Sequence, residues 1–138
     1  MQRTISGLIL ILSPLGVFAG DCTGPGAAFI LNPNVLSGQT VCGSSGSDTW
    51  QEWHQTSGTL TEYAKGPGHP VDPTHDVGSW SLGSGNTITY NYTGGSSYTF
   101  ELWLDLGNSS LLFCESGAGT NAVATVNTTF TGQGACPP

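Results

Sequence analysis

Residues 77–105 form three consecutive runs in which apolar and polar side chains alternate. A period of two residues predicts β-strands with one buried face and one face in water. The runs are separated by residues 83–86 and 94–97, which are rich in Gly, Ser and Asn. Gly and Asn tolerate the positive φ of short hairpin turns. The pattern therefore predicts three successive antiparallel strands.

The alternation also assigns each residue of these strands to a face. The apolar face carries Gly78, Trp80, Leu82, Ile88, Tyr90, Tyr92, Tyr98, Phe100, Leu102 and Leu104. The opposite face carries Thr87, Thr89, Asn91 and Thr93. We expect the apolar rows to share one dry interior and the threonine rows to face solvent.

Shorter runs on both sides of this region predict further strands. These are residues 35–42, 49–55, 59–64, 110–115 and 122–129. Residues 27–31 fit either a short strand or a helical turn, whereas 43–47 are typical of a flexible Gly-Ser loop. Residues 65–76 contain three prolines and predict the one long connection within the domain.

The second of these runs, residues 49–55, carries unlike side chains on its two faces. Trp50, Glu52 and His54 share one face. Gln51 and Trp53 share the other. A hydrogen bond at the surface is the simplest role for Glu52 and His54, although an acid–base pair is the alternative.

Seven or eight short strands joined mostly by tight turns predict an all-β fold. We expect a compact antiparallel meander, either a small up-and-down barrel or a sandwich. Closing the sheet into a barrel removes its unpaired edges.

One motif adds a family resemblance. Gly78-Ser79-Trp80, followed by a hairpin and a Tyr-rich strand, resembles the Gly-x-Trp hairpin of calycins, the lipocalin and avidin-like barrels. In calycins this motif usually opens the barrel, whereas several predicted strands precede it here. The chain is also similar to small secreted bacterial β proteins. The calycin resemblance implies a barrel that binds a small ligand.

The first 19 residues have the features of a secretory signal peptide. Arg3 precedes an apolar run over residues 5–18, and small residues lie at the cleavage offsets before residue 20. We therefore expect residues 1–19 to be removed and residues 20–138 to form a single secreted β domain, extracellular or periplasmic. The oligomeric state stays open.

Four cysteines follow the predicted signal peptide. They are Cys22, Cys42, Cys114 and Cys136. An even number in an exported domain predicts two disulfides. The pairing nearest in sequence joins Cys22 to Cys42 and Cys114 to Cys136, although a closed β structure could join distant strands instead.

The charge balance argues against two classes of partner. The chain has nine acidic residues, two basic ones and a formal net charge of −7. Nucleic-acid binding requires clustered Lys and Arg, and anionic membrane surfaces attract them. We expect neither partner, and we interpret the acidity as a means of keeping a secreted β protein soluble.

The long connection concentrates ionisable side chains. His69, Asp72, His75 and Asp76 offer nitrogen and oxygen ligands of the kinds that divalent metals use. The competing interpretation is an ordered loop that closes one end of the barrel, with its polar groups bonded to nearby backbone. We favour the loop, and we expect no cofactor.

The aromatic residues lead to the functional hypotheses. The first is a non-catalytic barrel that binds a small apolar or amphipathic molecule in an interior lined by Trp80, Tyr90, Tyr92, Phe100 and Leu102. The second is a carbohydrate- or surface-binding module. Its anchors would be Trp53 and Trp103, with Glu101 bonding sugar hydroxyls. The third is a structural or interaction protein without a small ligand. No nucleophile elbow, phosphate-binding loop or zinc-protease motif supports catalysis.

Overall fold

A computed structural model describes residues 22, 27–29, 32–63, 74–107, 109–115 and 122–137. The predicted signal peptide, residues 1–19, lies outside the described residues. No helix in the described part of the chain is long and apolar enough to cross a membrane.

The described residues form nine β-strands and one short helix. The strands are β1 (Ala27–Phe29), β2 (Gln39–Ser45), β3 (Asp48–His54), β4 (Thr59–Tyr63), β5 (Thr74–Leu82), β6 (Thr87–Tyr92), β7 (Ser97–Asp105), β8 (Ser110–Glu115) and β9 (Ala122–Thr131). The helix is the 3₁₀ turn η1 (Pro33–Leu36).

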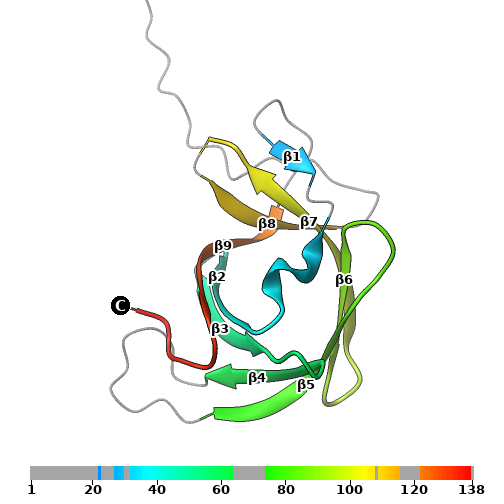
Figure 1. Cartoon of the computed structure of the whole chain (residues 1–138), viewed down its shortest axis with the longest axis vertical. Coiled ribbons are helices and arrows are strands. Elements are labelled where there is room, and N and C mark those ends of the chain that lie inside the picture. Colours follow the sequence, from blue (N-terminus) through cyan, green and yellow to red (C-terminus); the bar gives the residue numbers. More distant parts are fainter. Residues whose placement is uncertain are drawn as a thin grey trace, which may run out of the picture.

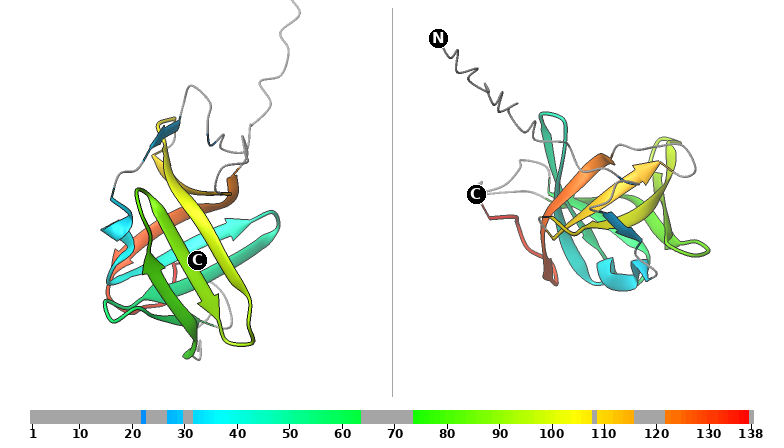
Figure 2. Two further views of the ribbon diagram at one scale, coloured as in Figure 1. Left: turned by 90° about the vertical axis from the view of Figure 1, so that its right-hand side faces the viewer. Right: turned by 90° about the horizontal axis from the view of Figure 1, so that it is seen from above.

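Strands β2 to β9 close into an up-and-down barrel (Figure 1). Each strand is antiparallel to the next in the chain, and β9 pairs back with β2. The short β1 extends the barrel wall by pairing with the end of β7. Side views show the strands inclined around the wall (Figure 2). The predicted all-β meander is confirmed, and the barrel is the form it takes.

The predicted faces of the central strands are confirmed. Trp80 lies opposite Tyr90, and Tyr90 lies opposite Tyr98 on the next strand, so the three side chains share one face. Trp80 and Tyr90 are buried in the core. On the outer face, the hydroxyls of Thr89 and Thr99 lie 2.8 Å apart and form a hydrogen bond.

The helix η1 closes one end of the barrel. It lies within the ring of strands in Figure 1, and Leu36 is fully buried in the core together with Leu60, Ile88 and Leu102. The Asn32 side chain accepts a hydrogen bond from the Asn34 amide, and proline follows Asn32 at the first helical position. This end of the barrel is therefore filled with apolar side chains.

Three predicted boundaries are wrong. Val35 lies in η1 and is half exposed, because the chain turns at Gly38, with a φ of +72°, before β2 begins. Strand β2 continues through residues 43–45 of the predicted flexible loop, since β3 and β9 both pair with it there. Strand β5 begins at Thr74, and so takes in three residues assigned to the long connection, residues 74–76.

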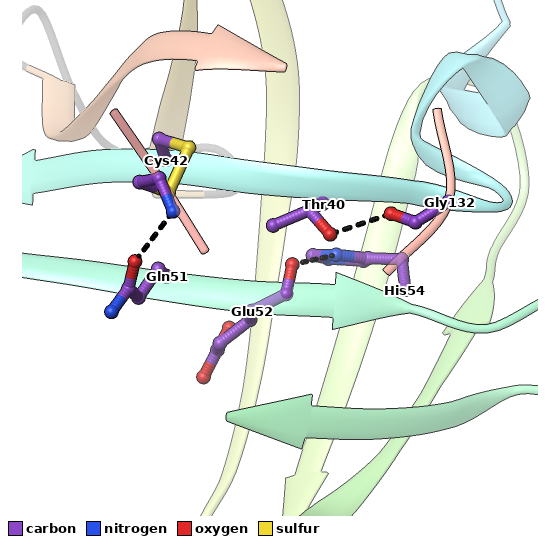
Figure 3. Close-up of a disulfide and its surroundings, with 7 residues drawn as sticks. Thr40, Cys42, Gln51, Glu52, His54 and Gly132 are labelled. Carbon is purple, nitrogen blue, oxygen red and sulfur yellow. Dashed lines mark hydrogen bonds between the residues drawn. A yellow bond between two sulfur atoms is a disulfide. The ribbon is translucent and has the colours of Figure 1, made fainter. Parts of the chain in front are cut away.

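The sequence-local disulfide pairing is also wrong. The disulfides join Cys22 to Cys114 and Cys42 to Cys136. The two cysteines of each pair are more than 90 residues apart in sequence, because barrel closure brings the ends of the chain to distant strands. Beside the second disulfide, the Cys136 amide donates to Oε1 of Gln51 at 2.8 Å (Figure 3).

Candidate functional site

The end of the barrel away from η1 contains a cavity of about 320 Å³, here called the mouth cavity. Its wall is made of Ser45, Trp50, Glu52, Tyr90, Tyr92, Tyr98, Phe100, Phe113, Val123 and Ala124. Six of these ten side chains are aromatic. Tyr98 is 50% exposed, so the cavity opens to solvent beside it.

The rings of the mouth cavity contact one another across four strands. Tyr98 stacks on Phe100 with centroids 6.2 Å apart and planes 8° apart. Phe100 meets Phe113 edge to face at 5.9 Å, and Phe113 contacts Trp50 at 5.8 Å. Contacts of this kind fix each ring through its neighbours. The wall is therefore preformed.

A glycine positions Trp50 in this wall. Gly43 lies directly opposite Trp50 in the β2–β3 register. A Cβ atom at residue 43 would overlap the Trp50 indole, so the absence of a side chain lets the ring lie over β2.

Among the described residues, Glu52 is the one carboxyl in the cavity wall. Its side chain is 8% exposed, and Oε1 accepts a hydrogen bond from the Tyr92 hydroxyl at 3.1 Å. Burial raises the pKa of Glu52 to about 7, the Tyr92 hydrogen bond opposes this, and the Glu62 carboxyl adds to it. The carboxyl can therefore hold or release a proton near neutral pH.

His54 lies deeper in the barrel on the same strand. Its Nε2 is 2.8 Å from the Tyr90 hydroxyl, and its Nδ1 is 3.3 Å from the Glu52 carbonyl oxygen, a contact shown in Figure 3. Burial lowers the pKa of His54 to about 4, so the ring is neutral at neutral pH. Nδ1 then donates to the Glu52 carbonyl, and the Tyr90 hydroxyl donates to Nε2.

Burial also raises the pKa of both tyrosines that contact these groups. Tyr90 is buried, and the nearby Glu52 carboxyl adds to the rise in its pKa. The pKa of Tyr92 rises for the same two reasons. Both hydroxyls are therefore neutral hydrogen-bond donors at neutral pH.

Three of the five residues predicted to line a ligand site lie in the cavity wall, namely Tyr90, Tyr92 and Phe100. The other two do not. Trp80 and Leu102 are buried in the filled core, and the Trp80 indole donates to the Gln55 carbonyl oxygen at 3.0 Å.

The structure adds four principal wall residues that were not predicted: Trp50, Glu52, Tyr98 and Phe113. Alternation had placed Tyr98 in the same row as Phe100, and Trp50 on the same face as Glu52. The missing information was that this face of β3 lines the same interior as β6 and β7.

The residues of the predicted carbohydrate platform lie far apart. Trp53 on β3 and Trp103 on β7 both belong to outward rows, and their strands are four apart around the eight-stranded barrel. They therefore cannot contact one sugar ring together. Trp103 packs against the Cys22–Cys114 disulfide, and its indole donates to Glu101 Oε2 at 3.2 Å.

Two of the four predicted metal ligands lie among the described residues. His69 and Asp72 lie outside the described residues. His75 Nε2 lies 3.4 Å from Glu62 Oε2, whereas Asp76 accepts a hydrogen bond from Thr61 at 2.8 Å. Within the described ranges, no three His, Cys, Asp or Glu side chains are grouped to hold a metal ion.

A second hollow, of about 400 Å³, lies beside the Cys42–Cys136 disulfide. Its wall is made of Cys42, Gly43, Thr49, Trp50, Asn127, Thr128, Cys136 and Pro137. The described residues give it no ionisable side chain and one aromatic residue, so they offer a ligand far fewer specific contacts than the mouth cavity does.

Comparisons with protein families, with curated proteins and with solved structures find no match to this chain. The candidate site therefore stands on its geometry.

Proposed function

We propose that this chain is a secreted, non-catalytic barrel that binds a small amphipathic molecule in the mouth cavity. The observation that carries the proposal is the enclosure of one buried carboxyl, Glu52, by six aromatic side chains at one end of a barrel whose other end is filled. Apolar cavities with a few fixed polar groups are the usual form of small-molecule sites.

Three further features support this proposal. Barrels of about eight strands have room in their interior for side chains or for one small ligand. Here side chains fill the end at η1, and the mouth cavity lies at the other end. The Gly78-Ser79-Trp80 hairpin resembles that of calycins, whose barrels bind small ligands. The two disulfides indicate an oxidising compartment, which agrees with export.

Titration with a neutral apolar dye, N-phenyl-1-naphthylamine, tests this function. We expect the dye to bind the wild-type protein and to quench tryptophan fluorescence. Trp50→Phe removes the indole in the cavity wall and should remove much of the quenching. Trp53→Phe is the matched control, because it removes an outward indole from the same strand.

A cavity-filling variant gives a second readout. Ala124→Phe places a ring in the mouth cavity and should abolish dye binding without lowering the thermal midpoint. Thr125→Phe adds the same ring at the next residue, which points to the opposite face. If no small apolar or amphipathic probe binds the wild-type protein, or if the dye binds Ala124→Phe as well as wild type, the function is refuted. A response to soluble glycans alone would favour the carbohydrate-binding alternative instead.

A further inference from the structure

The mouth cavity holds one carboxyl, Glu52, whose negative charge, once it ionises, no Lys or Arg in the described part of the chain can neutralise. The two basic residues of the chain, Arg3 and Lys65, both lie outside the described residues. Among the described residues, Tyr92 is the one hydrogen-bond donor to the Glu52 carboxyl. His54 is neutral at neutral pH and uses both ring nitrogens elsewhere.

A second carboxyl reinforces the negative potential. Glu62 on β4 lies directly opposite Glu52 in the register, so both side chains share the inner face. Glu62 is partly exposed and lies 3.4 Å from His75 at the rim. Two carboxyls on one face repel each other when both are ionised, and a positive charge between them would relieve that repulsion.

The remaining wall also favours a cation. The faces of Trp and Tyr rings attract organic cations, and the attraction strengthens when water is excluded. Trp50, Tyr90, Tyr92 and Tyr98 surround the same space as the Glu52 carboxyl. An anionic ligand would meet a like charge there, and a purely apolar one would bury a carboxyl without a counter-charge.

We propose that the ligand of the mouth cavity is an amphipathic organic ammonium ion whose positive head contacts Glu52 and the surrounding rings. Its apolar part would pack on Phe100, Phe113 and Ala124 in the same wall. This inference rests on the proposed function and adds the charge of the ligand to it.

An isosteric pair of probes tests the charge alone. Benzyltrimethylammonium and neopentylbenzene have the same shape, but a carbon atom replaces the charged nitrogen in the second. We expect the ammonium to bind the wild-type protein at least about tenfold more tightly, measured by calorimetry or tryptophan fluorescence. Glu52→Gln should remove most of that preference. Glu101→Gln, which makes the same change on the outer face of β7, should keep it.

The outcomes separate the two proposals. If wild type binds both probes equally, or prefers neopentylbenzene, the cation is excluded while the apolar site stands. If Glu52→Gln keeps the full preference, the Glu52 contact is refuted. If neither probe nor the neutral dye binds, the proposed function fails and this inference fails with it.

Discussion

Glu52 and His54 are two residues apart on β3, and burial shifts their pKa values in opposite directions. The pKa of Glu52 rises from 4.5 to about 7, and that of His54 falls from 6.5 to about 4. Between these values, folded Glu52 keeps a proton that the unfolded chain releases, so rising pH favours unfolding. Folded His54 lacks a proton that the unfolded chain binds, so rising pH favours folding.

Because these contributions oppose each other, Glu52→Gln should expose the effect of His54. We expect the free energy of unfolding of Glu52→Gln, relative to wild type, to rise by about 1.4 kcal/mol per pH unit between pH 4.5 and 7. The total is about 3 kcal/mol. Urea denaturation at each pH measures it, with Glu101→Gln as the control. A difference independent of pH would show that Glu52 is ionised in the folded protein throughout.

The same titration predicts how binding of a permanent cation depends on pH. Benzyltrimethylammonium does not titrate, so its affinity should rise through about pH 7 as Glu52 ionises. The other groups that face Glu52 are Glu62 with its partner His75, the neutral ring of His54, and the hydroxyls of Tyr90, Tyr92 and Tyr98. A profile that persists in Glu52→Gln would show that Glu52 is not the group responsible.

At the scale of the elements, the hairpin of β5 and β6 depends on a glycine. A Cβ atom at Gly78 would overlap the backbone carbonyl oxygen of Asn91 on β6. Gly78→Ala must therefore move the two strands apart, and we expect it to lower the free energy of unfolding by about 2 kcal/mol or more. Ser79→Ala, at the exposed neighbouring position, should change it by less than about 0.5 kcal/mol. Equal effects in thermal or urea unfolding would contradict this account.

The strands and their faces could be predicted from sequence because alternation records burial directly. The rows of Tyr90 and Phe100 face inward as expected. Strand β2 could not be predicted beyond Cys42, since hydrogen bonds from β3 and β9 hold Gly-Ser residues that have little intrinsic preference for a strand. The burial of Glu52 could not be predicted either, because isolated carboxylates normally remain in water.

At the scale of the whole molecule, the disulfides tie both ends of the chain to the barrel. The pairing could not be predicted because it depends on closure, which no local pattern records. Peptide mapping without reduction should recover Cys22 linked to Cys114 and Cys42 linked to Cys136. Recovery of the sequence-local pairs would contradict the fold described here.

Removing either disulfide should lower the free energy of unfolding, because each disulfide closes a long loop. The sequence separations are 92 and 94 residues. We expect Cys42→Ala with Cys136→Ala to lower the free energy of unfolding by about 4 kcal/mol. The tail also contacts the wall through Thr40, which donates to the Gly132 carbonyl oxygen at 2.7 Å (Figure 3). A loss below about 1 kcal/mol in urea denaturation would mean that such contacts hold the tail without the disulfide.

Because η1 closes one end, the barrel is open at its other end and has no passage through it. Whatever enters must leave by the same opening, and nothing can be threaded through. A ligand longer than the mouth cavity is deep would leave part of its length in solvent. The mouth cavity therefore has room for the end of a larger molecule as well as for a whole small one.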